Sequence, residues 1–157
     1  MLRGTFAAFV LTSLVFLPGF AFAATNINPF PSGNGGTQVW TVANSPYVIN
    51  GQVAMRYGTL TIEPGVVIKF QPGASLQAHA DVPVTAVGTA AEPIIFTSIK
   101  DDSVGGDTNG DAAASTPAAG DWGHIDFGSG STNRDLLLEY VKIKYGGGIS
   151  KSAGLDM

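Results

Sequence analysis

The residues best suited to chemistry in this sequence are acidic, and they lie together in a segment rich in Gly, Ala, Ser and Thr, residues 101–121. The five acids of this segment are Asp101, Asp102, Asp107, Asp111 and Asp121. Asp107, Asn109 and Asp111 take positions 1, 3 and 5 of a D-x-N-x-D pattern, a spacing that turns three side-chain oxygens toward one point. Hard cations prefer such oxygen ligands, so the segment predicts a candidate calcium site.

The calcium pattern is incomplete at two positions. Ala112 stands where a glycine makes the sharp turn of a calcium loop, and Ala118 stands where a bidentate carboxylate closes the ligand shell. Asp121 would have to complete the shell, or Asp101 and Asp102 from the start of the segment. A solvated polar loop without metal explains the same composition, so both interpretations stay open. The candidate ligands are Asp107, Asn109, Asp111 and Asp121, and the candidate cofactor is calcium.

Catalytic groups are sparse in this sequence. A site that transfers protons to or from a substrate needs acids or a metal together with a cation on one outward face. The charged residues expected at outward positions are Lys69, Asp126, Glu139, Lys142 and Lys144. Lys69, Asp126 and Lys144 could stack on neighbouring rungs of a repetitive sheet. A solvated face with compensating charges is the simpler explanation, because paired exposed charges commonly serve only solubility.

The histidines and tryptophans have structural explanations. His79 and His124 are far apart in the sequence and have no nucleophile partner, and the chain contains no Cys, so no catalytic residue is predicted. Trp40 and Trp122 are expected to anchor the core, with sugar stacking as the functional alternative.

The elements that must position these residues are short strands. Apolar segments rich in Val, Ile, Thr and aromatic residues recur between Asn-Gly, Pro-Gly and Gly-Thr turn signals, and none has the length of a normal helix. They cover residues 47–50, 59–62, 66–70, 75–80, 83–87, 93–98, 124–127 and 136–145. The fold class is therefore all-β.

Alternation along the strands predicts which side chains face inward. In VVIKF the inward residues are Val66, Ile68 and Phe70, with Lys69 outside. PIIFTS places Ile94 and Phe96 inside, and VKIKY places Val141, Ile143 and Tyr145 inside.

A weak repeat aligns EPGVVIKF, from Glu63, with EPIIFTS, from Glu92, at an offset of 92 − 63 = 29. HIDF continues this series if the polar stretch 100–120 projects from one rung. Such a repeat favours a solenoid of stacked rungs, although a β-sandwich with a hairpin at Asn50-Gly51 uses similar strands.

The N-terminal residues have the pattern of a secretory signal peptide over 1–23. Arg3 precedes an apolar run, which a Pro-Gly pair interrupts before a small-residue site at Ala21-Phe22-Ala23. Cleavage before Ala24 leaves 157 − 23 = 134 residues with 7 basic and 12 acidic side chains, a net charge of −5 that disfavours nucleic acid. We expect residues 24–37 to form a flexible leader, with ordered structure beginning near Val39 and Trp40. We also expect that the mature chain, after cleavage of the signal peptide, does not span the membrane.

Several strings together are similar to a known family. GTLTIEPGVVIKF, AVGTAAEPIIFTSIKDDSVGGDTNGD, GDWGHIDF and LEYVKIKYGG resemble bacterial secreted proteins built of right-handed parallel β-helix repeats, over roughly residues 38–148. The resemblance implies a partial right-handed parallel β-helix over 38–157, with the long polar loop 100–121 inserted between rungs. His124 and Ala112 stand where the family has glycine. The chain stops shortly after YGGG, so we expect a C-terminal truncation and an open solenoid end.

The function expected from these observations is that of a module rather than an enzyme. We expect a non-catalytic secreted or cell-surface scaffold that serves adhesion or glycan binding at the surface of a bacterium. A fragment of a polysaccharide lyase or hydrolase and a calcium-stabilised binding module are the alternatives. The expected partners are polysaccharide or another cell-surface component, and further rungs or another chain at the open end.

Overall fold

A computed structural model describes residues 23–29, 36–79, 81–129, 136–147 and 149–150. The signal peptide predicted over 1–23 lies outside these residues except for Ala23, and so do 30–35 of the predicted leader and the final residues 151–157. The described chain is made of short strands and one 3-10 turn, η2 (Val42–Asn44). Within this part of the chain there is no helix long and apolar enough to cross a membrane.

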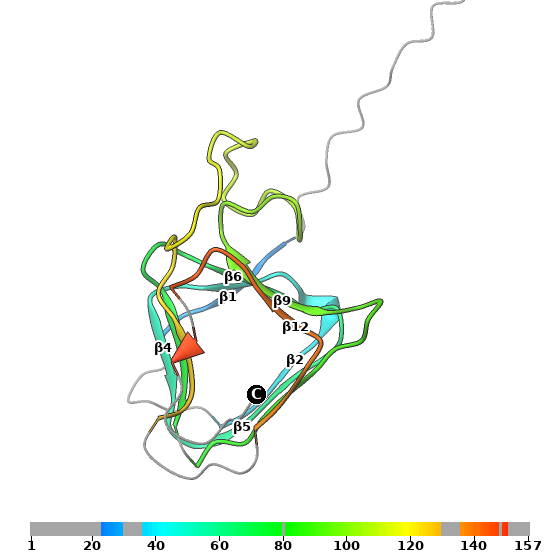
Figure 1. Ribbon diagram of the computed structural model, residues 1–157, viewed down its shortest axis with the longest axis vertical. Coiled ribbons are helices and arrows are strands. Elements are labelled where there is room, and N and C mark those ends of the chain that lie inside the picture. The colour runs from blue at the N-terminus through cyan, green and yellow to red at the C-terminus, as the bar shows by residue number, and fades with distance from the viewer. Residues whose placement is uncertain (1–22, 30–35, 80, 130–135, 148, 151–157) are drawn as a thin grey trace, which may run out of the picture.

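The strands form three parallel sheets that the chain visits in turn (Figure 1). One sheet contains β1 (Thr25–Ile27), β3 (Tyr47–Ile49), β6 (Val67–Phe70), β9 (Ile94–Ser98) and β12 (Val141–Ile143). A second contains β2 (Gly36–Trp40), β5 (Gly58–Ile62), β8 (Val84–Val87) and β11 (Leu136–Glu139). The third contains β4 (Gln52–Met55), β7 (Ser75–His79), β10 (Ile125–Ser129) and β13 (Ile149–Ser150). We call them sheets A, B and C.

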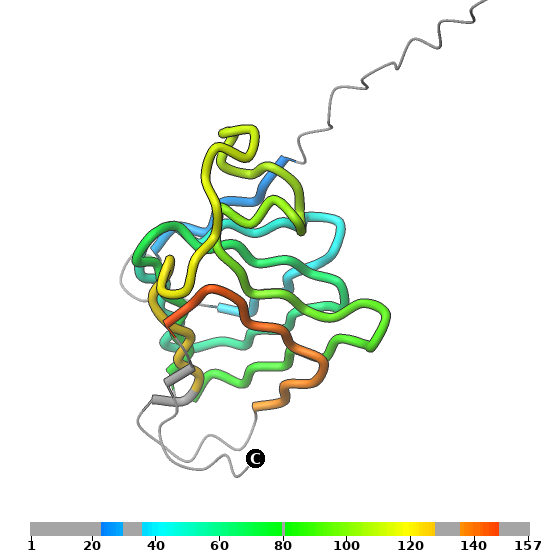
Figure 2. The backbone as a smooth tube through the Cα atoms, turned by 45° about the horizontal axis from the view of Figure 1, so that its top comes forward, coloured from blue at the N-terminus to red at the C-terminus, as the bar shows by residue number. Residues whose placement is uncertain are grey.

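The order of visits makes the molecule a solenoid. After β1, the chain passes through sheets B, A and C in the same order four times, and each strand pairs in parallel with the strand one rung away. Figure 2 shows the rungs stacked on one another. The fold is a right-handed parallel β-helix, as predicted, and the parallel pairing excludes the sandwich. Asn50 and Gly51 join strands of different sheets, so they form no hairpin.

Columns of apolar side chains along the helix axis make the core. In sheet A, Tyr47, Ile68 and Phe96 are in register on successive rungs, and Ile143 follows Phe96. Phe70 stacks on Trp122, with ring centroids 4.1 Å apart. The inward positions predicted for β6 and β9 are confirmed, because their side chains are fully buried. Burying each large apolar side chain stabilises the fold by about 1.5–3 kcal/mol.

The structure corrects four details of the predicted elements. β1 lies within the expected leader and pairs with β3, and β2 begins at Gly36, so regular structure starts before Val39. The segment 136–145 contains two strands, β11 and β12, separated by Tyr140 at φ 49°. HIDF contributes β10 to sheet C, so it does not continue the sheet A series; β12 does. Lys69 is outside the core yet completely buried.

The predicted repeat offset differs from the register by one residue. Ile68 pairs with Phe96, an offset of 96 − 68 = 28, whereas the two Glu-Pro pairs differ by 29. The turn before β6 contains one residue more, because Gly65, at φ 78°, lies between Pro64 and Val66. Alignment of the two Glu-Pro turns therefore gives a spacing between paired residues that is one residue too long.

Candidate binding cleft and acidic loop

The long connection from β9 to β10 projects from the solenoid and is the main departure from its regular rungs (Figure 1). Its first residues fold back over the outer face of sheet A. A Cβ atom built on Gly105 would lie 3.2 Å from Pro46 Cβ and 3.4 Å from Val67 Cγ1. This packing shows that the loop lies against the outer face of the sheet at this point.

Asp101 fastens the loop to the sheet through both carboxylate oxygens. Oδ2 accepts hydrogen bonds from the Thr97 hydroxyl on β9 and from Lys144 Nζ, just after β12, each at 2.7 Å. Oδ1 accepts from the backbone N–H and the hydroxyl of Ser103. Asp101 is 2% exposed, so its charge is buried and compensated in place.

The same contacts set the protonation of this pair. Burial alone would raise the pKa of Asp101, but hydrogen bonds from Lys144, Ser103 and Thr97 outweigh it and lower the pKa to about 2. The hydrogen bond to Asp101 raises the pKa of Lys144 above its ordinary value. At neutral pH the pair is therefore an ionised clamp that joins two neighbouring rungs.

Lys69 is buried beneath the loop. Its side chain leaves β6 on the outer face and its ammonium donates a hydrogen bond to the carbonyl of Gly106. Burial lowers the pKa of Lys69, while the nearby Asp102, Asp101 and Asp107 act in the opposite direction. The prediction that Lys69 faces solvent is wrong because the loop, contributed from 37 residues further along the chain, covers it.

The tip of the loop is held by two aspartates. Asp107 accepts hydrogen bonds from the backbone N–H groups of Gly110, Asp111 and Ala112, at 2.7, 3.2 and 2.9 Å. Asp111 accepts from Ala114 N, from Ser115 N and from the Ser115 hydroxyl. Ala112 adopts φ 52°, so it takes the left-handed conformation that a glycine would take at that position, at a cost of roughly 1–2 kcal/mol.

The structure brings three of the four predicted metal ligands together, Asp107, Asn109 and Asp111. Carboxylate oxygens of Asp102, Asp107 and Asp111 lie within 4.8 Å of one another. Asp102 Oδ1 is buried without a hydrogen-bond partner. Burial and the charge of Asp107 raise the pKa of Asp102. Asn109 donates its amide N–H to Asp111 Oδ2, at 2.8 Å, and to the Ser115 hydroxyl.

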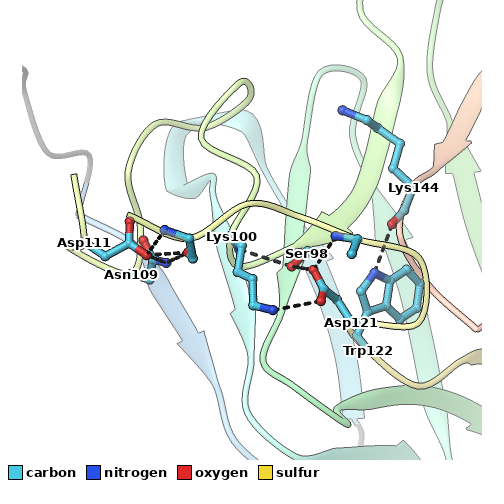
Figure 3. Close-up of polar contacts among 9 residues, drawn as sticks. Ser98, Lys100, Asn109, Asp111, Asp121, Trp122 and Lys144 are labelled. Carbon is cyan, nitrogen blue, oxygen red and sulfur yellow. Dashed lines mark hydrogen bonds and ion pairs between the residues drawn. The ribbon is translucent and has the colours of Figure 1, made fainter. Parts of the chain in front are cut away.

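The fourth predicted ligand, Asp121, is not part of this acidic group. It forms an ion pair with Lys100, at 2.8 Å, and accepts hydrogen bonds from the Ser98 hydroxyl and from Ala118 N, both at 2.9 Å (Figure 3). Asp121 therefore closes the base of the loop, directly before Trp122.

A cleft of about 370 Å³ lies between the loop and the end of β12. Its lining residues come from the start of the loop, from the second half of the loop and from the residue that follows Lys144. They are Lys100, Asp101, Asp102, Ser103, Ala113, Ser115, Thr116, Pro117 and Tyr145. Tyr145 has φ 61°, a backbone conformation that bulky residues adopt at a cost and that often accompanies binding sites.

Comparison with protein families agrees with this architecture. A family model described as a pectate-lyase-like beta helix domain matches residues 33–154. The chain belongs to the pectate-lyase-like β-helix family. No curated protein and no solved structure matches the chain.

In this pectate-lyase-like β-helix domain, the outward charges do not form one column. Asp126 lies on sheet C opposite Gln77, whereas Lys69 and Lys144 belong to the outer face of sheet A, so the three residues do not stack. Glu139 and Lys142 are exposed. His79 is also exposed, and His124 Nε2 contacts the Gln77 amide at 3.3 Å.

The tryptophans are core anchors, as predicted. Trp40 and Trp122 are 2% and 1% exposed, which excludes sugar stacking on either ring. Trp122 also donates its indole N–H to the carbonyl of Lys144 (Figure 3). Among the described residues the exposed aromatic rings are Tyr57 and Tyr140, while Tyr145 lines the cleft. Sequence reasoning missed Tyr145 because it gave the residue an inward place in an alternating strand that in fact ends at Ile143.

Proposed function

We propose that this chain is a non-catalytic carbohydrate-binding module, exported to the outside or the surface of a bacterial cell, and that its cleft holds the glycan. The observation that carries the proposal is the lining of the cleft. It combines Tyr145 with hydroxyl and carboxylate groups from a loop that is clamped to a rigid solenoid. Aromatic rings provide area for sugar faces, and fixed polar groups provide orientation.

Binding fits the cleft better than hydrolysis does. A glycosidase needs two carboxyl groups beside the bond that it cleaves, and the second must be free to attack the sugar or to activate water. The two carboxylates that line this cleft are Asp101 and Asp102. The Asp101 carboxylate already accepts four hydrogen bonds and is 2% exposed, so it has no free lone pair for that role.

The amines around the loop are engaged as well. Lys144 is paired with Asp101, Lys100 is paired with Asp121, and Lys69 is buried against Gly106. A lyase that removes a proton from a sugar needs an amine or guanidine within reach of the substrate. The three lysines beside the loop therefore serve to hold it in place.

A matched pair of tyrosine variants tests the proposal. Tyr140 and Tyr145 flank β12, and both have positive φ, but only Tyr145 lines the cleft. Asn tolerates positive φ, so Tyr145→Asn removes the ring with little backbone strain. Glycan-array screening and calorimetry should find a ligand whose affinity falls about tenfold in Tyr145→Asn and is unchanged in Tyr140→Asn. Equal effects of the two variants would contradict the placement of the glycan site at the cleft beside Tyr145. Formation of unsaturated products from polyuronates would instead identify the protein as a lyase.

A calcium-stabilised loop is a second candidate, favoured by one observation. Asp102 Oδ1 is buried without a partner, beside the carboxylates of Asp107 and Asp111. A divalent cation would supply the missing partner and relieve the repulsion among the three acids. Calorimetry with calcium, on the native chain and on Asp111→Asn, tests this candidate. The candidate fails if millimolar calcium produces neither heat nor a shift in melting temperature.

Export and edge pairing complete the proposal. N-terminal sequencing of protein from the culture medium or cell surface should find a chain that begins at Ala24.

β11, β12 and β13 are the outer strands of their sheets among the described residues, so further rungs or another chain could pair there. Light scattering of the purified chain would detect such pairing as a mass above that of the monomer.

A further inference from the structure

The charges that surround the cleft do not balance. Three lysines, at positions 69, 100 and 144, stand beside five aspartates, at positions 101, 102, 107, 111 and 121, a net charge of −2. Lys100 and Lys144 each neutralise one aspartate through an ion pair of 2.7–2.8 Å. Asp102, which lines the cleft, has no such ion pair.

The hydrogen-bonding groups of the lining are biased in the same direction. Ser103 donates its hydroxyl proton to Asp101, and Ser115 donates its hydroxyl proton to Asp111. Both hydroxyls can therefore only accept a hydrogen bond from a ligand. Asp102 Oδ1 has no hydrogen-bond donor either, although this oxygen is itself buried, and a buried carboxylate oxygen without a donor is unfavourable. The Ser103 and Ser115 hydroxyls and the Asp102 carboxylate are thus acceptors, while the ammonium group of Lys100, which also lines the cleft, is paired with Asp121.

We propose that the glycan recognised by this cleft carries protonated amino groups, so that the natural ligand is an amino-sugar oligosaccharide. This inference rests on the proposed carbohydrate-binding function and names its ligand class. The ammonium group of an amino sugar brings several N–H donors and a positive charge to Asp102. The hydroxyl groups of the same sugar can donate hydrogen bonds to Ser103 and Ser115. A uronate would bring a further carboxylate to a site whose nearby ammonium groups are already engaged.

Three oligosaccharides of equal length test this ligand class: glucosamine oligomers, the same oligomers with acetylated amines, and galacturonate oligomers. Binding is measured by calorimetry in chelator-containing buffer, at a pH where the amine is protonated and carboxylates are ionised. The glucosamine oligomers should bind about fivefold or more tighter than their acetylated counterparts, and the difference should shrink as salt is raised. Galacturonate oligomers should bind most weakly.

Two variants with the same change in net charge locate the effect. Asp102→Asn should abolish the preference for the free amine while it retains binding of the acetylated oligomer. Asp81→Asn, at an exposed acid between β7 and β8, should leave the preference unchanged. The salt dependence of the native chain gives an independent readout if Asp102→Asn does not fold.

The outcomes separate the two proposals. If the acetylated or galacturonate oligomers bind as tightly as glucosamine oligomers, the inference is overturned while the carbohydrate-binding function stands. If none of the three oligomers binds and the wider glycan screen finds no ligand, the proposed function fails, and the inference fails with it.

Discussion

Asp101→Asn is the substitution that most directly tests how the loop is held. Asparagine has the same shape, but it lacks the negative charge that pairs with Lys144, and its amide NH₂ group would face hydrogen-bond donors. The native pKa of Asp101 lies at about 2 against an ordinary value of 3.8. At 1.36 kcal/mol per pKa unit, this difference corresponds to about 2 kcal/mol of stability at neutral pH.

That value is an upper bound for the ion pair itself, because Lys144 is 34% exposed and water screens its charge. Misplaced amide donors add a cost of the same order. We expect Asp101→Asn to lower the free energy of unfolding by about 2 kcal/mol and the melting temperature by about 5 °C. Chemical denaturation gives the first quantity and calorimetry the second. The control is Asp81→Asn, at an exposed position, which should leave the melting temperature unchanged.

The pH dependence has a definite sign. The folded pKa of Asp101 is lower than its unfolded value, so the stabilisation is fully present above pH 3.8 and is lost as pH falls from there toward 2. The native chain should lose this contribution over that window, and Asp101→Asn should lack it. Hydrogen exchange should also become faster over residues 102–118 in the variant. Unchanged stability together with unchanged exchange would refute the clamp.

Four further substitutions, one of them a matched control, test the packing of the solenoid and its loop. Lys69→Met should lower the free energy of unfolding by about 1–3 kcal/mol in denaturant melts, because it leaves the Gly106 carbonyl without its donor and removes the cation that offsets the charge of Asp102; an unchanged stability would contradict this. Gly58→Ala should cost about 3 kcal/mol or more, since its Cβ would lie 1.9 Å from Gly36 O at φ 95°, whereas Gly73→Ala, in open space at φ 72°, should cost about 1 kcal/mol. Phe70→Ala should cost about 3–5 kcal/mol, measured the same way, because it empties the centre of the stack between Phe96 and Trp122.

Local patterns in the sequence predict the strands well, because inward and outward positions follow from alternation within a few residues. Ile68, Phe70 and Phe96 show this, since each is fully buried as expected. Local patterns do not assign the strands to their sheets, because that assignment depends on how many residues each turn between strands contains. Gly65 changes the apparent repeat from 28 to 29, and the long loop hides that β10 belongs with β7.

Contacts across the loop could not be predicted from local patterns. Lys69 has the sequence signature of a solvated residue, and its burial depends on Gly106, which lies 37 positions later. Asp101 and Lys144 are 43 positions apart, and nothing in either neighbourhood pairs them. The D-x-N-x-D spacing did locate Asp107 and Asp111 beside each other. It could not place Asp102 rather than Asp121 next to them, because that choice depends on how the ends of the loop meet the sheet.

The position of Lys144 links the cleft to the completion of the solenoid. Lys144 follows β12, one rung beyond β9, yet it supplies the cation that holds Asp101, and its neighbour Tyr145 supplies one wall of the cleft. Each rung buries its apolar face only when the next rung stacks on it, so the loop that leaves β9 is fixed only after β12 has paired. A change that weakens the pairing of β12, such as loss of the Ile143 side chain beside Phe96, should therefore reduce the proposed glycan binding, although Ile143 does not line the cleft. The regular rungs provide the rigidity, and the inserted loop is held to them by the ion pairs of Lys144 and Lys100 and by the hydrogen bond from Lys69.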